Sequence, residues 1–232
     1  MTNPPQTSSN EVIAWSCISV SGPDAASFLQ GQLTQDVSIV DADGAWSLVL
    51  APDSIVIAST FIRRTEEGFG LVVESAVAET ALKRLQRFLL RTDCQLNLST
   101  STDGPFVTVG DRVDRRWPGS SEFAGKLTPH TFGTTFVNST ISFTKGCFTG
   151  QELVGRLDAR GSSVPWRLVH VSGADRQVID AGLRSRGPGG PQGLTSWVGW
   201  EGRGEGLGIV HRTLIAEFDS LRQQGIIVQA ID

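Results

Sequence analysis

Hydrophobic residues in the first hundred positions alternate between strand-like and helix-like spacing. Val12 to Val20 is apolar and rich in β-branched side chains, which predicts a strand. In the segment SGPDAASFLQGQL, Pro23 and Asp24 suit the first turn of a helix. Phe28 and Leu29 give that helix an apolar face to bury. Further strands are predicted at residues 46–50, 55–62, 69–73 and 95–98.

A second helix is predicted from Ser75, a good N-cap, to about Arg91. Alanine and leucine recur in this segment every three or four residues, so one face of the helix is apolar. The resulting order is strand, helix, several strands, helix and strand. This order is typical of an α+β fold and is close to a split βαβ unit.

The second half of the chain has a different pattern. Phe106 to Val109 predicts a short strand, whereas residues 110–140 contain several glycines and prolines and give weak signals. Beyond residue 160, short apolar segments alternate with glycine-rich turns, which is typical of a small β-barrel or sandwich; the segments are 164–171, 195–198, 206–211 and 226–228. We therefore predict a flexible N-terminal arm, an α+β region and a C-terminal β-rich, barrel-like domain, over residues 1–12, 13–162 and 163–232.

Composition narrows the class of protein. The chain has 232 residues, and 39% of them are hydrophobic, which is enough for one large core or two modest ones. Its net charge of −4 predicts no basic surface of the kind that binds nucleic acid. The longest mostly apolar run, residues 55–62, is far short of the roughly 20 residues that span a membrane. The polar first residues lack the pattern of a signal peptide, so we expect a cytoplasmic protein with no membrane partner.

The three cysteines are far apart in the sequence and show no metal-ligand spacing, so no metal site is expected. Unpaired thiols of this kind suit a reducing compartment. Cys17 and Cys94 fall within predicted strands, where buried and unreactive thiols are expected. Cys147 differs, because it follows Lys145 at the predicted start of a helix, where a cation and the helix dipole favour the thiolate. A small buried thiol with only a packing role is the alternative.

The string KGCFTGQE, residues 145–152, matches the K-G-C-[YF]-x-G-Q-E signature of YgfZ-type folate-binding proteins, which are relatives of the glycine-cleavage aminomethyltransferase, or T-protein. ISVSGPDAASFLQGQLTQDV resembles the opening strand and helix of that family, and LKRLQRFLLRTDCQLNL resembles its second helix and next strand. GLTSWVG and GLGIVHR are similar to parts of its C-terminal barrel. The resemblance implies an aminomethyltransferase-like folate-binding fold and tetrahydrofolate or a derivative as cofactor. It also implies a part in iron–sulfur cluster assembly or maintenance, with iron–sulfur client proteins as partners.

Several residues of the matching segments have an expected role within this resemblance. Cys147 is the functional thiol, and Lys145 and Arg156 suit the carboxylates of a folate tail. Gln151 and Glu152 suit the N–H and C=O groups of a pterin. The segment QGQLTQD is expected beside the folate cavity, although a polar loop bonded to its own backbone explains it equally well. The expected cofactor-binding residues are Lys145, Gly146, Gln151, Glu152, Arg156, Gln32, Thr34 and Asp36.

Arginines at helical spacing, Arg84, Arg87 and Arg91, predict a basic stripe on the second helix. A solvated face is the simpler interpretation of this stripe. Attraction of an anionic cofactor or of nucleic acid is the other.

Two departures from the family pattern bear on function. The aminomethyltransferases carry a catalytic carboxylate shortly after the turn that matches APDS, but Ala58 and Ser59 stand there, and neither replaces that acid or base. Family members often carry a glutamate just after the proline of LTPHTFG, where this chain has His130 and Thr131. The sequence leaves three functions open: a folate-binding accessory protein that uses Cys147, a one-carbon transferase, and a ligand-free interaction scaffold.

Overall fold

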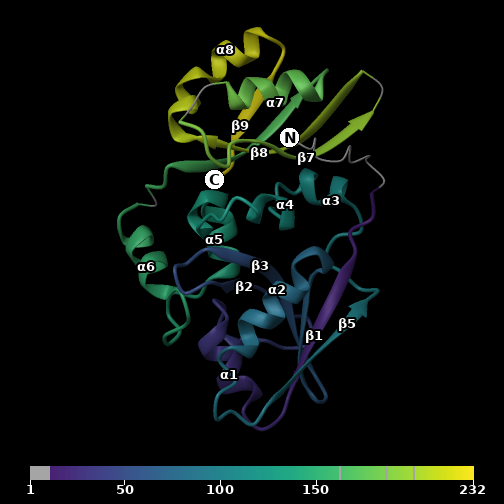
Figure 1. Ribbon diagram of the computed structural model, residues 1–232, viewed down its shortest axis with the longest axis vertical. Coiled ribbons are helices and arrows are strands. Elements are labelled where there is room, and N and C mark those ends of the chain that lie inside the picture. Colours follow the sequence, from purple (N-terminus) through teal and green to yellow (C-terminus); the bar gives the residue numbers. More distant parts are fainter. Residues whose placement is uncertain (1–10, 162, 186–187, 201) are drawn as a thin grey trace.

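The computed structural model describes residues 11–161, 163–185, 188–200 and 202–232, so most of the predicted N-terminal arm lies outside the described residues. Figure 1 shows two sheets separated by a layer of short helices, with further helices on the outer side of each sheet. At the end of the predicted arm, the backbone carbonyl of Glu11 accepts the N–H of Val109 at 3.0 Å. The layered mixture of helices and sheets confirms the predicted α+β class.

Five antiparallel strands form the first sheet, in the order β2-β3-β4-β1-β5: β1 (Trp15–Ser21), β2 (Ala45–Leu50), β3 (Val56–Thr65), β4 (Gly68–Glu74) and β5 (Gln95–Ser101). Its outer face is covered by α1 (Ala25–Gln32), α2 (Ser75–Gln86) and the short 3-10 turn η1 (Val37–Ile39). Alternate side chains explain the two faces. Ile18 and Val20 pack under these helices, whereas Trp15 belongs to a separate cluster with Val72 and Phe106.

The predicted strands of the first sheet are confirmed, but the predicted bounds of α2 are not. Glu74 is the N-cap, and Ser75 is the first helical residue, with its Oγ bonded to Ser16 Oγ at 2.8 Å. The helix ends at Gln86 rather than near Arg91. The chain tightens there into three-residue turns, in which the N–H of Phe88 bonds to the carbonyl of Leu85 at 3.0 Å.

Short helices make up the middle layer: α3 (Val109–Asp114), α4 (Ser120–Phe123), η2 (Pro129–Phe132) and α5 (Thr134–Thr140). The predicted strand at Phe106–Val109 is wrong, because Thr108 is the N-cap of α3. Thr108 and Asp111 form a reciprocal capping box, with bonds of 2.8 and 3.1 Å. After this layer comes α6 (Gln151–Ala159), which begins with the last two residues of KGCFTGQE. A turn that enters a helix was predicted here.

The second sheet has four antiparallel strands in the order β7-β8-β6-β9: β6 (Trp166–Gly173), β7 (Gly193–Trp200), β8 (Arg203–His211) and β9 (Ile227–Ala230). All four were predicted. Three short elements on its outer face were not: α7 (Arg176–Arg184), η3 (Arg212–Glu217) and α8 (Phe218–Gln223). Within the described ranges this sheet is open, and no closure into a barrel is seen.

One hydrophobic core joins the middle layer to both sheets. Leu48 and Leu50 of β2 lie in the same buried cluster as Leu168 of β6 and Ile209 of β8. The aromatic rings of the middle helices fill the space between them; they include Phe123, Phe132 and Phe136. The two sheets are therefore packed on a shared layer.

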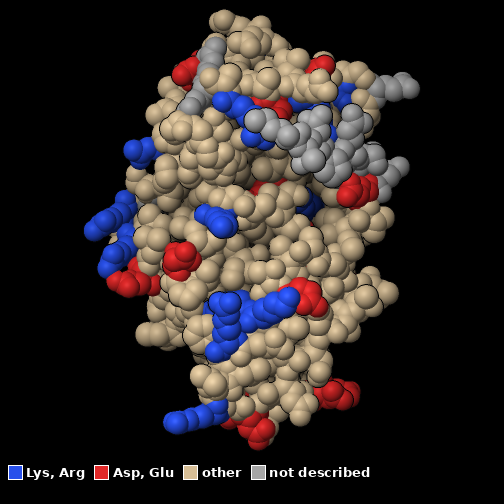
Figure 2. All heavy atoms as spheres, in the orientation of Figure 1, with Lys and Arg blue, Asp and Glu red and all other residues tan. Residues whose placement is uncertain are grey.

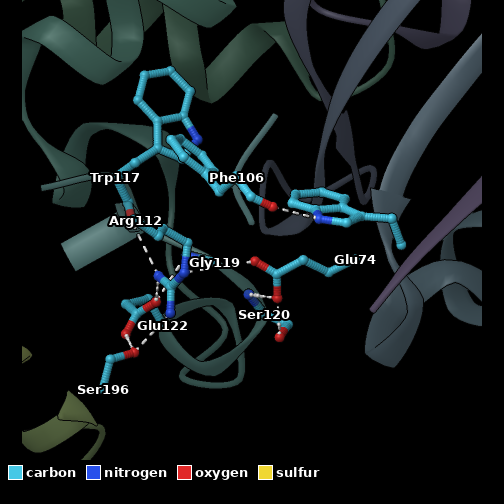
Figure 3. Close-up of polar contacts among 9 residues, drawn as sticks. Glu74, Phe106, Arg112, Trp117, Gly119, Ser120, Glu122 and Ser196 are labelled. Atoms are coloured by element: carbon cyan, nitrogen blue, oxygen red, sulfur yellow. Dashed lines mark hydrogen bonds and ion pairs between the residues drawn. The ribbon is translucent and has the colours of Figure 1, made fainter. Parts of the chain in front are cut away.

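A buried ionic network crosses the same layer (Figure 3). Arg112 Nη1 donates to Glu122 Oε2 at 2.6 Å, and Arg112 Nη2 donates to Ser196 Oγ at 2.8 Å. Glu74 at the end of β4 lies 3.8 Å from Arg112 Nε and accepts the N–H of Ser120 at 3.0 Å. Because Glu74 belongs to the first sheet and Ser196 to the second, the network links both sheets through α3 and α4.

Candidate functional site

Three segments that are far apart in the sequence meet at the amino end of α6. They are residues 30–36 at the end of α1, the turn 51–54 between β2 and β3, and residues 145–150, which we call the motif loop. Thr149 donates its N–H to Gly31 O at 3.0 Å. Ser54 Oγ donates to Gly150 O at 2.5 Å. QGQLTQD and KGCFTGQE therefore belong to one structural unit.

Lys145 fastens the motif loop to the end of α1. Its side chain is buried, and Nζ donates to the carbonyls of Gln30, Leu33 and Gln35 at 2.7, 2.9 and 2.8 Å. An ammonium group has three protons, so all of them are in use here and none is left for a folate carboxylate. Burial lowers the pKa of Lys145 to about 8, and the charge of Asp36 opposes that shift.

Cys147 is exposed and lies in the loop itself. The prediction that it begins a helix is wrong, because α6 starts at Gln151 after the N-cap Gly150. Cys17 and Cys94 are both half-buried, and burial raises the pKa of each thiol. Cys147 is thus the thiol that solvent reaches most easily.

Gly150 has a backbone conformation and a close contact that require glycine, whereas Gly146 has neither. The φ of Gly150 is +85°, and a Cβ there would lie 2.8 Å from Ala51 O, so a larger residue would be both strained and blocked. A Cβ at Gly146 would meet no atom within 4 Å. Gly150 therefore makes the close contact with the turn 51–54, whereas the backbone of Gly146 makes none of this kind.

The predicted solvated stripe on α2 is wrong at Arg84. Its side chain is buried against the first sheet, where Nε donates to Leu50 O at 2.7 Å and Nη1 donates to Gln32 Oε1 at 2.9 Å. Gln32 Oε1 also accepts from Thr149 Oγ1 at 3.4 Å, which connects α2 to the motif loop. Arg87 is exposed, as the stripe predicted.

Thr34 and Asp36 make bonds that hold the loop after α1. Thr34 is fully buried, donates to Thr140 O at 2.6 Å and accepts the N–H of Leu48 at 2.8 Å. Asp36 accepts from the hydroxyl and N–H of Ser38 and from Gln30, and these bonds lower its pKa. Asp36 therefore has the local bonding of a polar loop, whereas Thr34 ties that loop to β2 and to the end of α5.

The predicted ligands on α6 differ in their exposure to solvent. Gln151 is half-buried at the first position of the helix. Glu152 and Arg156 form an ion pair one turn apart on the exposed side. An exposed pair of this kind is worth little, about 0.3–0.5 kcal/mol, so both groups remain available to a ligand.

A small cavity lies at the other end of α6. It has room of about 30 Å³, enough for water and far below the roughly 300–1,000 Å³ of typical small-molecule sites. His130 is buried there, and neither ring nitrogen has a hydrogen-bond partner among the described residues. Burial lowers the pKa of His130. The lining residues are His130, Gly133, Thr134, Val137, Asn138, Asp158, Arg167 and Asp232.

None of the nine predicted site residues lines this cavity. Sequence reasoning singled out His130 as a departure from the family pattern, but the charged neighbours Asp158 and Arg167 were missed. They come from α6 and β6, and no local sequence signal pairs them. Among the described residues there is no cluster of three or more side chains suited to a metal ion, and no helix has the length and apolar character to cross a membrane.

No family model matches the chain, but the chain is similar to a curated protein and to solved structures. The chain is 33% identical over 116 residues to the "Iron-sulfur cluster assembly factor IBA57 homolog, mitochondrial" of Pyricularia oryzae. This match covers 48% of the chain and 29% of that relative, so the matched part spans less than a third of the relative's length. The fold is similar to the crystal structure of glycine cleavage system aminomethyltransferase T from Bartonella henselae. The TM-score is 0.56 at 15% identity, over 88% of this chain and 80% of that one.

The architecture is thus that of the aminomethyltransferase T-proteins. Together with the match to the assembly factor, it fits a YgfZ-type relative of the T-protein family, as the string KGCFTGQE indicated.

Proposed function

We propose that this protein is an accessory factor of iron–sulfur cluster assembly or maintenance and that Cys147 is its functional thiol. The observation that carries the proposal is the exposure of Cys147 on a loop fastened by Lys145 and Gly150. The 33% identity to an iron–sulfur cluster assembly factor supports the same role. Thiolates are the usual protein ligands of iron–sulfur clusters.

A single exposed cysteine cannot hold a cluster alone, because such clusters take four ligands. Among the described residues, no group of three or more side chains is arranged to hold a metal ion. The thiol therefore acts together with a client or assembly protein that supplies the other ligands. The relative is named as mitochondrial, and the cytoplasmic location expected here stays a prediction.

Tetrahydrofolate or a derivative is the proposed small-molecule ligand, supported by the fold shared with aminomethyltransferase T. Of the two cations predicted to bind the folate tail, Arg156 is the available one, because Lys145 donates all three protons inside the protein. We expect weak to moderate affinity. Replacing Arg156 with Ala should weaken folate binding by about tenfold, which is the value of one charge-assisted bond.

Aminomethyl transfer is not proposed. Ala58 and Ser59 stand on β3 where the family pattern places a carboxylate, and neither side chain is an acid. Titration with tetrahydrofolate tests ligand binding by itself, and its failure would favour a scaffold without a ligand.

The functional test is complementation of cells that lack the gene, with the activity of iron–sulfur enzymes as the measurement. Cys147→Ser should restore little or no activity. Cys17→Ser and Cys94→Ser are matched controls, because both thiols are half-buried and lie outside the motif loop, and they should restore it. Full restoration by Cys147→Ser would remove the thiol from the proposed function.

A further inference from the structure

Arg84 is a buried cation with no carboxylate beside it in the described part of the chain. Its side chain is only 5% exposed. Nε and Nη1 bond to Leu50 O and Gln32 Oε1, which are both uncharged acceptors. Nη2 has no hydrogen-bond partner at all among the described residues. A guanidinium group carries two protons on that nitrogen, so two strong donors are unused.

An unpaired buried charge is unfavourable unless something compensates for it. Here the surroundings oppose the charge further, since burial and the neighbouring Arg87 lower the pKa of Arg84 to about 10. A structural arginine would be expected to have an aspartate or glutamate within reach. The unused face of the guanidinium instead matches the geometry of an incoming anion, because its planar donors suit a carboxylate.

The half-exposed ring of Phe88 lies over the guanidinium. The ring of Phe88 stacks on Arg84, with 4.4 Å between the guanidinium carbon and the ring centroid, and Phe88 is 40% exposed. Phe88 lies in the turn after α2, so its exposed ring can change rotamer and leave the guanidinium without a movement of the helix. Figure 2 shows lysine and arginine side chains gathered over α2, which attract anions to this face.

We propose that Arg84 is the centre of a carboxylate-binding site that opens when Phe88 turns away. Nη2 would donate to the carboxylate, while Nε and Nη1 keep the guanidinium fixed against Leu50 and Gln32. Gln32 Oε1 accepts from both Arg84 and Thr149 of the motif loop, so a carboxylate bound to Arg84 would act on a hydrogen bond of the loop that carries Cys147. The site is separate from the proposed roles of Arg156 and Cys147, and it stands if either of those fails.

The test is the binding of glutarate to the whole protein at constant ionic strength, measured by calorimetry and by the rise in melting temperature. Glutaramide, which has the same shape without the charge, is the control ligand. Glutarate should bind saturably and glutaramide should not. Arg84→Met should abolish the effect, and Arg84→Lys should weaken binding by about tenfold or more, because the planar fork is lost. Phe88→Ala should tighten binding by removing the cover.

The matched control variant is Arg91→Met, which removes an exposed arginine of the same stripe and should bind as the wild type does. Equal binding of glutarate by Arg84→Met, or an equal effect of glutaramide on the wild type, would overturn the proposal. If Arg84→Met does not fold, Arg84→Lys and Phe88→Ala decide the matter, since opposite changes in affinity are required of them. A hexaglutamate peptide distinguishes the source: tighter binding than glutarate indicates an acidic partner protein, and weaker binding indicates a small carboxylate.

Discussion

The chemistry of His130 is set by the cavity in which it lies. Its imidazole is 2% exposed, and the described residues leave both nitrogens without a partner. Burial favours the neutral ring, Asp158 opposes this effect, and Arg167 reinforces it, with the result that the pKa is lowered. The fold therefore holds a neutral histidine at a position where protonation is unfavourable.

Stability should fall in mild acid because of this residue. With the folded pKa below the unfolded value of about 6.5, the unfolded chain binds more protons as pH drops through that range. The contribution is fully present above about pH 6.5 and is lost as pH falls toward the folded pKa. His130→Gln should flatten this dependence in urea unfolding between about pH 5 and pH 8. His170, whose pKa burial also lowers, remains in both proteins. Parallel pH profiles for wild type and variant would contradict the expectation.

Residue identities at the site were readable from the sequence, but the directions of the side chains were not. Lys145, Thr34 and Arg84 each belong to a segment that sequence reasoning selected, and each turns inward to bond carbonyl groups. Those carbonyls come from segments distant in sequence, so no local pattern reveals them. Cys147 was easier to predict, because its glycine-rich neighbourhood is itself local.

On the scale of elements, the motif loop depends on one anchoring cation. Lys145→Met should leave the carbonyls of Gln30, Leu33 and Gln35 without their donor and lower the free energy of unfolding by about 1–3 kcal/mol. The amide of Thr149, bonded to Gly31, should exchange with deuterium faster, because the loop is no longer tied to α1.

Chemical denaturation and hydrogen exchange measure the two effects. Lys83→Met is the control, since Lys83 is 72% exposed in its side chain and pairs only with Glu79 at 3.5 Å among the described residues. Its loss should change stability by no more than about 0.5 kcal/mol. Unchanged stability and exchange in Lys145→Met would mean that Lys145 does not anchor the motif loop.

Strands were predicted better than helices for a physical reason. Alternation of polar and apolar residues and β-branched runs are strong signals along a strand. The nine strands of the described residues were all predicted, and the one further predicted strand, at 106–109, is not found. The helices of the middle layer are four to seven residues long, too short to show a helical period. The capping box at Thr108 and Asp111 is the signal that would have corrected the predicted strand.

At the scale of the whole molecule, the two sheets are connected by both apolar and ionic contacts. Glu122 is fully buried, and burial by itself would raise its pKa. Arg112, the hydroxyl of Ser196 and the N–H of Gly119 outweigh that effect and lower the pKa, so Glu122 remains charged. Ser196 lies at a register shift in β7, which places its hydroxyl 2.6 Å from Glu122 Oε1.

Glu122→Gln should therefore destabilise the whole molecule. The substitution keeps the shape of the side chain but leaves Arg112 with only the more distant Glu74, and an uncompensated buried charge costs about 3–5 kcal/mol. Both sheets should still unfold in one transition, because Leu50 and Leu168 share a core with the middle layer. Tryptophan fluorescence and far-ultraviolet circular dichroism in denaturant should give coincident curves, both shifted to lower denaturant.

Glu79→Gln is the control, because it breaks only an exposed ion pair and should lower the free energy of unfolding by less than about 0.5 kcal/mol. Separate transitions in Glu122→Gln would show that the ionic network, rather than the shared apolar core, makes the two sheets cooperative.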